Sequence, residues 1–465
     1  MKGSIQMSFG SKILNYREDI LKDLAELITI PSVRSEAEEG MPFGKEPAKA
    51  LNRILDMADH MGFVTKNIGN YAGHAEYGDG DEVAAVVAHV DIVPAGEGWD
   101  TDPFTLTRKG NLYFGRGAAD DKGAAIVALY CLKVLRDEAI KPKRRLRVIF
   151  GAGEETGSND LEMYLKSEQM PAMAFTPDSE YGICNREKGL LRLNILAKGN
   201  DSSVIRKFIS GTVVNAVPSK ATAFIKCNDA ACTALESAAK TAEGNFNFIK
   251  TDDGFEVTSI GKASHAMQPQ EGFNAATYLM KLLWKVFSAN ELGTLVSFIN
   301  NSIGTELHGE SLGVNTSDEE SGPLTLNLGL VRIENDCASI GVDIRYPVTA
   351  NGEKILTVIT KATAAGGLET SLNSDVKPLF LPESSPFISL LQGAYAAVTG
   401  ESASIYATGG GTYARAFDGH AVAFGPFFPD EPDRRLHNTN ESIDIDRFML
   451  HAQVCLEAMY RMLSE

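Results

Sequence analysis

Five short segments of the sequence carry side chains that can bind a cation or hold a proton. They are His89-Val90-Asp91, Gly115–Gly123 with Asp120 and Asp121, Gly151–Ser158 with Glu154 and Glu155, Thr176-Pro177-Asp178, and His437-Asn438-Thr439-Asn440-Glu441. Together they offer imidazole nitrogens and carboxylate oxygens, the donors from which hydrolytic sites with two divalent ions are built. Each segment alone is weak evidence. A capped strand end with a surface histidine also explains the first segment, and a helix N-cap also explains the second.

The glycine-rich segment that begins at Gly151 is not a dinucleotide-binding motif. Such a Gly-x-Gly-x-x-Gly motif would need its third glycine at position 156, where the chain has Thr156, and Glu154 and Glu155 would repel a pyrophosphate. Two adjacent carboxylates suit a cation instead, because one can bind the ion while the other handles a proton. The sequence also lacks the Gly-x-x-x-x-Gly-Lys phosphate loop and the Gly-x-Ser-x-Gly nucleophile elbow.

Short apolar runs precede three of these segments and predict the strands that position them. The runs are Val83–His89, Leu146–Phe150 and Met173–Phe175, and a similar run occurs at Ala421–Phe424. Continuous apolar runs are typical of strands buried on both faces. In an open α/β sheet, ligands bind outside the carboxyl ends of the strands. His89 and Asp91 are two residues apart, so we expect both to face the same cleft.

Helical periodicity alternates with these strands and sets the fold class. Helix patterns occupy residues 11–30, 47–61, 122–135 and 446–463. Between residues 187 and 379, strands at 191–197 and 324–331 mix with helix patterns at 229–242, 274–288 and 353–364. We therefore predict an α/β protein with a mainly parallel-sheet catalytic domain, helices on both faces (residues 1–186 and 380–465), and an inserted α+β lid domain (187–379).

The composition argues against several classes of protein. The 465 residues carry a net charge of −17, which argues against nucleic-acid and membrane-surface binding. No apolar run has the roughly 18 residues that a membrane span needs, and the start shows no secretory signal. The six cysteines form no Cys-x-x-Cys pair, so we expect reduced thiols in a cytoplasmic protein rather than a disulfide framework.

The order of the five segments resembles the co-catalytic zinc peptidases of the aminoacylase and carboxypeptidase G type. The chain is most similar to the bacterial PepV-type (Xaa-His, carnosinase-like) dipeptidases, and the resemblance covers nearly the whole chain. The cues for this subfamily are Thr176-Pro177-Asp178, Asn215-Ala216-Val217-Pro218, Asp343-Ile344-Arg345-Tyr346-Pro347 and Gly409-Gly410-Gly411-Thr412-Tyr413-Ala414-Arg415.

The resemblance implies a role for each candidate residue. It makes Asp120 a bridge between two metal ions, and it implies a cis peptide between Asp120 and Asp121. It implies that His89 and Asp178 bind one metal and that Glu155 and His437 bind the other. For catalysis it implies Glu154 as general base, Asp91 as the residue that orients His89, and His265 as a lid residue that holds the developing oxyanion. For the substrate it implies Asn215 and Arg345 as ligands of the carboxylate, with Gly410 and Gly411 as further binding positions.

The implied activity is hydrolysis of unblocked dipeptides with two divalent ions, zinc or alternatively manganese or cobalt. The long lid favours a monomer, since shorter lids in this family dimerise and receive a histidine from the partner. Three alternatives stay open: a deacylase or desuccinylase acting on N-acyl amino acids, an aminopeptidase for longer peptides, and a non-catalytic metal-binding module. Glu154, which need not bind metal, disfavours the module.

Overall fold

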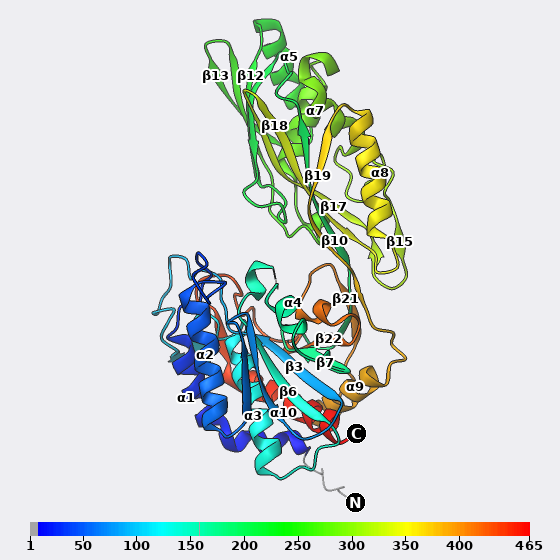
Figure 1. Cartoon of the computed structure of the whole chain (residues 1–465). Helices are drawn as coiled ribbons and strands as arrows, with labels where there is room; N and C mark the ends of the chain where they lie inside the picture. Colours follow the sequence, from blue (N-terminus) through cyan, green and yellow to red (C-terminus); the bar gives the residue numbers. More distant parts are fainter. Residues whose placement is uncertain (1–7, 158) are drawn as a thin grey trace, which may run out of the picture. The chain divides into compact units, whose positions relative to one another are not determined.

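The computed structural model describes residues 8–157 and 159–465 and divides into two compact units. The outer unit comprises the chain up to Asn185, Leu379–Tyr406 and Gly411–Glu465, and the inserted unit comprises Arg186–Pro378 and Ala407–Gly410 (Figure 1). The sequence prediction placed residues 407–410 in the outer domain. The domain boundaries stay a prediction, because compact units do not show which segments fold on their own.

The outer unit is a layered α/β structure. Its helices are α1 (Arg17–Ile28, preceded by the 3-10 helix η1, Phe9–Tyr16), α2 (Lys45–His60), α3 (Lys122–Asp137), α4 (Asn159–Leu165), α9 (Pro386–Thr399) and α10 (Ile445–Ser464). Within the described residues, a nine-stranded sheet joins β1 (Val64–Ile68), β2 (Ala72–Tyr77), β6 (Arg145–Gly151), β3 (Val83–His89), β7 (Met173–Thr176), β22 (Ala421–Phe424), β9 (Ile183–Glu187) and β20 (Leu379–Phe380), with β21 (Ile405–Thr408) paired to β9.

The central strands of this sheet are parallel and buried on both faces. β3 pairs in parallel with β6 on one side and with β7 on the other, and β7 pairs in parallel with β22. Alternate residues of β3 join different clusters: Val86 belongs to a core cluster that includes residues of α1, α3 and α10, whereas Val87 belongs to one that includes residues of α4 and the 3-10 helix η4 (Tyr413–Phe417). This alternation explains the uninterrupted apolar run of the strand. The predicted fold class is therefore confirmed.

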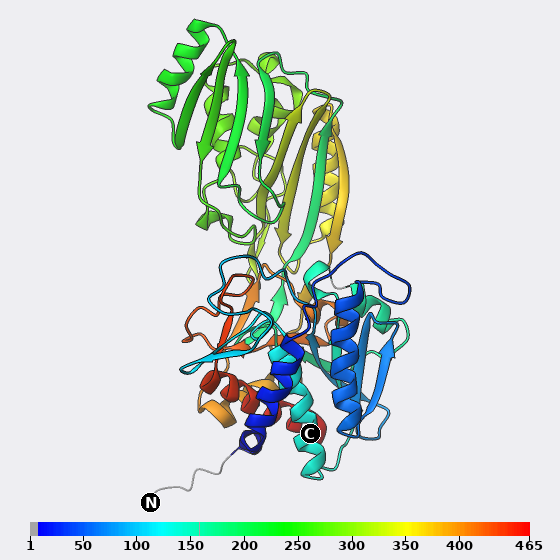
Figure 2. The ribbon, with the colours of Figure 1, turned by 90° about the vertical axis from the view of Figure 1, so that its left-hand side faces the viewer.

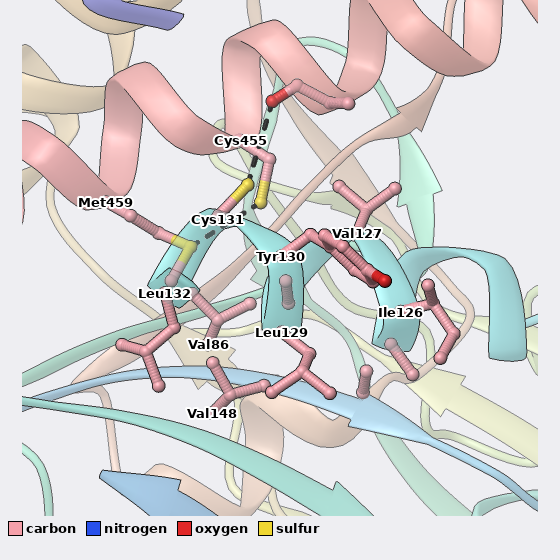
Figure 3. Packing of buried hydrophobic residues seen from close by; sticks show 14 of the residues in the cluster. Val86, Ile126, Val127, Leu129, Tyr130, Cys131, Leu132, Val148, Cys455 and Met459 are labelled. Atoms are coloured by element: carbon pink, nitrogen blue, oxygen red, sulfur yellow. Dashed lines mark hydrogen bonds between the residues drawn. The ribbon is translucent and has the colours of Figure 1, made fainter. Parts of the chain in front are cut away.

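Helix α3 is apolar almost all round because it lies between the sheet and α10. Figure 3 shows Leu129 and Leu132 directed toward Val86 and Val148 of the sheet, while Cys131 faces α10. The Cys131 thiol lies 3.7 Å from the carbonyl oxygen of Ala452 on α10. Burying each such aliphatic side chain contributes about 1.5–3 kcal/mol. This packing fixes the start of α3, which directly follows Asp120 and Asp121.

The inserted unit is an α+β layer structure. Within the described residues, its eight-stranded antiparallel sheet runs in the order β13 (Asn245–Thr251), β14 (Gly254–Ile260), β12 (Lys220–Lys226), β11 (Ile205–Ser210), β17 (Thr325–Glu334), β18 (Cys337–Tyr346), β10 (Gly189–Ala197) and β19 (Glu369–Val376). The helices α5 (Asp229–Ala239), α6 (Ala275–Trp284), α7 (Ala289–Ser302) and α8 (Gly352–Ala365) accompany it. Figure 2 shows the strands side by side.

Short two- and three-residue strands complete the two units. They are β4 (Thr107–Lys109), β5 (Leu112–Phe114), β8 (Ser179–Glu180), β15 (Ser317–Asp318), β16 (Gly322–Pro323), β23 (Pro426–Phe427) and β24 (Ser442–Asp444). Among the described residues, no helix combines the length and the apolarity that a membrane crossing requires.

Two sequence expectations are wrong. The middle segment was expected to hold three helices, but α7 is a fourth. Gly293, with φ of 81°, interrupts the helical periodicity of α7. The sequence signal for the start of this helix was the capping box formed by Ser288 and Glu291. The expectation of reduced thiols fails for Cys227 and Cys232, which form a disulfide with a Cα–Cα distance of 5.8 Å. The turn between β12 and α5 brings the two cysteines together, and their five-residue separation matches no familiar motif.

Because the outer unit contains two buried histidines, we expect acid to lower its free energy of unfolding. Burial lowers the pKa of His74 to about 4 and that of His451 to about 3, and each imidazole pairs with a tyrosine hydroxyl, Tyr164 or Tyr181. Below the ordinary pKa of 6.5, the unfolded chain therefore binds protons that the folded chain excludes. We expect the free energy of unfolding to fall by about 2 kcal/mol per histidine between about pH 7 and pH 5.

Urea titrations at several pH values measure this effect. His74→Gln is expected to weaken the dependence on pH, whereas the same change at the exposed His60 leaves it intact. An identical pH dependence in the wild type and in His74→Gln would contradict the assignment for this residue.

Candidate metal centre

Three parallel strands end beside one another and deliver most of the candidate side chains. His89 is the last residue of β3 and lies opposite Gly151, the last residue of β6. The 3-10 turn Glu154–Thr156 follows β6, and Asp178 follows β7, the other neighbour of β3. The carboxyl ends of adjacent parallel strands share one edge of the sheet, so these residues meet there.

Asp120 lies between the two candidate histidines. Its Oδ1 is 3.0 Å from Nε2 of His89, and its Oδ2 is 3.0 Å from Nε2 of His437. The same Nε2 of His437 is 3.2 Å from Oε2 of Glu155. Each oxygen of Asp120 thus faces a different imidazole, which is the arrangement expected of a carboxylate that bridges two cations.

A second group of candidate ligand atoms surrounds His89. One donor atom from each of His89, Glu154 and Asp178 lies within 4.8 Å of the others, and the same holds for His89, Asp120 and Glu155. The peptide bond between Asp120 and Asp121 is cis, which confirms that expectation. The outer unit therefore assembles all five predicted ligands and Glu154 from segments far apart in the sequence.

The electrostatics of this group favour bound positive charge. Burial, together with repulsion from neighbouring carboxylates, holds the pKa of Glu154 and of Asp178 well above the ordinary range. Burial opposes ionisation of Asp120 too, but hydrogen bonds to His437 and His89 outweigh it and lower the pKa of Asp120. Hydrogen bonds to Asp120 and Glu155 raise the pKa of His437 to about 10. Carboxylates outnumber the two imidazoles that can neutralise them.

This donor set fits a pair of divalent cations. Carboxylate oxygens and imidazole nitrogens are the ligands that zinc and manganese accept, and they surround a shared carboxylate. As the resemblance implies, one cation would be held by His89 and Asp178, the other by Glu155 and His437, and both by Asp120. This assignment of residues is a proposal.

Asp91 fastens the turn that carries the two glutamates. Its Oδ1 accepts the N–H of Glu154 at 3.2 Å, and its Oδ2 accepts the N–H of Glu155 at 3.1 Å. Nδ1 of His89 lies 3.0 Å from the backbone carbonyl oxygen of Asp91 and 3.4 Å from its carboxylate. The sequence assigned Asp91 only to His89. The structure adds that one buried carboxylate orients three candidate residues.

Asp91→Ala is therefore expected to weaken both metal binding and turnover. We expect a loss of about 10- to 100-fold in metal affinity, in kcat, or in both, because supporting partners of metal ligands typically have effects of this size. Competition titration with a chromophoric chelator measures the affinity. Asp79→Ala, at an exposed position of the same unit, is the control. Unchanged metal affinity and kcat in Asp91→Ala would contradict this role.

A buried ion pair that the sequence did not single out holds the loop before Asp120. Oε1 of Glu441 accepts the N–H groups of Ala119 and Asp120, and Oε2 accepts the N–H of Gly117. Oε2 also binds Nη1 of Arg116 at 2.6 Å, and both side chains are 1% exposed. Arg116 further donates to the carbonyl oxygen of Asn438, next to His437. The signal available in the sequence was a pair of charges within segments already quoted as motifs.

Four of the remaining predicted residues, Asn215, His265, Arg345 and Gly410, lie in the inserted unit, whereas Gly411 belongs to the outer unit. The N–H of Ala266 donates to the carbonyl oxygen of Asn215, and Ala216 forms a β-bridge with His265. Nη1 of Arg345 donates to the carbonyl oxygen of Gly409 at 2.8 Å, beside Gly410. Gly411 is the first residue of the last outer segment.

His265 is held as a neutral imidazole with a defined tautomer. Desolvation and the nearby charge of Arg345 lower the pKa of His265. The N–H of Met267 donates to Nδ1 of His265 at 3.1 Å, so the ring proton of the neutral form lies on Nε2. An Nε2–H is a hydrogen-bond donor of the kind that a developing oxyanion needs.

The chain belongs to the peptidase family M20/M25/M40. The model of this family matches residues 85–461, which include all five proposed metal ligands. The resemblance identified from the motifs is therefore confirmed.

Curated relatives match over nearly the full chain. The Bacillus subtilis (strain 168) protein named "Putative dipeptidase YtjP" is 33% identical over 466 residues, covering 98% of this chain and 100% of the relative. The Staphylococcus aureus (strain bovine RF122 / ET3-1) protein named "Putative dipeptidase SAB1611c" is 34% identical, covering 98% of this chain and 99% of its own.

Solved structures share the fold at low sequence identity. Human carnosine dipeptidase 1 matches with a TM-score of 0.60 at 14% identity, covering 97% of this chain and 98% of that one. The aminoacylhistidine dipeptidase of Vibrio alginolyticus matches with a TM-score of 0.57 at 16% identity, covering 100% of this chain and 99% of that one. These two likenesses show the fold.

Proposed function

We propose that this protein is a metal-dependent dipeptidase that hydrolyses the peptide bond of unblocked dipeptides. The observation that carries the proposal is the bridging position of Asp120 between His89 and His437, with Glu154 beside the same group. Membership of the peptidase family and the names of the full-length relatives support the reaction class.

Each of the proposed site residues has a separate role in the reaction. Two bound divalent ions would lower the pKa of a water and polarise the scissile carbonyl. Glu154 accepts the proton of the attacking water and passes it to the leaving amine. Burial and the nearby carboxylates raise the pKa of Glu154, the direction that moves a carboxyl from its ordinary value toward that of an effective general base. His265 offers its Nε2–H to the developing oxyanion, and Arg345 and Asn215 bind the terminal carboxylate of the substrate.

Zinc is the metal we propose, with manganese and cobalt as the alternatives that the donor set admits. The monomeric state and the cytoplasmic location expected from the sequence stay predictions. Light scattering on the purified protein tests the first, and fractionation of the source cells tests the second.

One experiment tests the function. The purified protein is analysed for metal content and assayed with a panel of dipeptides, the same dipeptides carrying an N-acetyl or N-succinyl group, and a tripeptide. We expect two metal equivalents and cleavage of the unblocked dipeptides. Preferential cleavage of the N-acylated compounds would replace the proposal by a deacylase. Preferential cleavage of the tripeptide would indicate an aminopeptidase, and metal binding without any cleavage a non-catalytic module.

A further inference from the structure

Polar side chains gather on one face of the inserted sheet, at the end of three neighbouring strands. Arg345 of β18 lies opposite Thr325 of β17, and Asp343 lies opposite both Asn327 of β17 and Arg192 of β10. Residues that face each other across a sheet share a face, so these five side chains point to one side. The alternate residues of these strands, Leu326, Ile344 and Leu191, lie in the core.

Asp343 is the centre of this group. It is fully buried, and its carboxylate receives two hydrogen bonds from Arg345, Nε to Oδ1 at 2.6 Å and Nη2 to Oδ2 at 3.1 Å. Nε of Arg192 donates to the same Oδ2 at 3.1 Å. The single carboxylate thus accepts hydrogen bonds from two guanidinium groups, and the side chains of Asp343, Arg345 and Arg192 together carry a net charge of +1.

Among the described residues, the hydrogen bonds of Arg345 leave part of its largely buried guanidinium without a partner. The group has five N–H donors. Two are used on Asp343 and one on the carbonyl oxygen of Gly409, so Nη1 and Nη2 each keep one further N–H. Paired N–H groups on Nη1 and Nη2 match the two oxygens of a carboxylate.

We propose that Asp343 is a positioning residue that sets the specificity for substrates with a free terminal carboxylate. It acts through Arg345: the bidentate contact fixes the plane of the guanidinium and directs the remaining N–H groups. Without it, the long arginine side chain would have to be ordered by each incoming substrate, at a cost in conformational entropy. The inference rests on the proposed function, because it assumes that Arg345 binds the substrate.

The alternative is a purely structural pair, in which Arg345 merely neutralises a buried carboxylate. The two possibilities differ in substrate dependence. A structural role would affect all substrates alike through stability. A positioning role affects only substrates whose terminal carboxylate Arg345 recognises.

Asp343→Asn tests this difference, since asparagine keeps the size of the side chain and removes its charge. Steady-state kinetics compare a dipeptide with the same dipeptide carrying a C-terminal amide. For the free acid we expect KM to rise by about 10- to 100-fold with a smaller change in kcat, as loss of substrate positioning does. For the amide we expect less than about a threefold change, so that the preference for the free acid collapses. Asp336→Asn, at an exposed turn of the same hairpin, is the matched control and keeps the preference.

A double-mutant cycle adds an independent readout. In an Arg345→Ala background, Asp343→Asn is expected to change KM by less than about threefold, because a residue that acts through Arg345 has nothing left to position. If Asp343→Asn melts below the assay temperature, Asp343→Glu replaces it. Glutamate keeps the buried charge but moves the carboxylate by one methylene, and the same loss of preference is expected.

Equal losses on the acid and the amide, or a full effect of Asp343→Asn without Arg345, would overturn the inference. These failures are distinct from failure of the proposed function, in which the wild-type protein cleaves no dipeptide.

Discussion

Glu154→Ala is expected to give a folded, metal-loaded protein with very low turnover. Glu154 lies within 4.8 Å of donor atoms of His89 and Asp178 but is not assigned as a ligand, so its loss should leave the metal content unchanged. Its proposed task is proton transfer, and removing such a group lowers kcat by about 10²- to 10⁴-fold. Metal analysis of the purified variant and kcat on a good dipeptide measure the two quantities.

The matched control for this variant is Glu162→Ala, which alters an exposed glutamate on the nearby helix α4. We expect Glu162→Ala to keep near-normal kcat. Near-normal turnover by Glu154→Ala would refute the assignment of the base. Loss of metal from Glu154→Ala would instead make this residue a ligand.

Asp120→Asn is expected to abolish binding of the metal pair and to lower activity by at least roughly a thousandfold. Its two oxygens contact two different imidazoles, and asparagine keeps only one carbonyl oxygen and no charge at this position. Metal ions are expected to raise the thermal stability of the wild-type protein, and this increase should disappear in the variant. Plasma emission spectroscopy and thermal melts with and without added zinc check these outcomes.

Metal binding to the wild-type protein is expected to strengthen as pH rises. The pKa of His437 is raised to about 10 and that of His89 is also raised, so both imidazoles carry protons in the metal-free protein near neutral pH. A metal ion must displace these protons, and each proton released makes the apparent affinity rise about tenfold per pH unit.

Calorimetry in two buffers of different ionisation enthalpy counts the released protons.

Asp433→Asn, at an exposed position near His437, is the control for Asp120→Asn and should keep full metal content. Two tightly bound ions in Asp120→Asn, or metal affinity independent of pH, would contradict the bridging arrangement.

The positions of the strand-end residues follow from local sequence pattern. The apolar run Val83–His89 became β3 with the same bounds, because a strand buried on both faces has no room for polar side chains. The local pattern is therefore enough to place His89 at the end of β3, Glu154 after β6 and Asp178 after β7 at one edge of the sheet. The helix α3 was also evident from its periodicity.

Other features depend on contacts that leave little trace in the sequence. Arg116 and Glu441 pair across 325 residues, and no local pattern indicates that a buried carboxylate will bind the loop before Asp120. The role of Asp343 depends on the register of β10, β17 and β18. Helix α7 was missed because Gly293 breaks its period, and the Cys227–Cys232 bond depends on the geometry of one turn.

The amino-acid sequence by itself determined the donor types of the metal centre, the strands that end at it and the family to which the chain belongs. Only the tertiary structure decided that Asp120 faces a different histidine with each oxygen, that Asp91 also binds the N–H groups of Glu154 and Glu155, and that Glu441 and Asp343 hold candidate residues in place. The physical reason is the separation along the chain between the residues that interact. Strand and helix patterns arise from burial repeated every few residues, whereas these carboxylates find their partners through the packing of segments that are far apart in the chain.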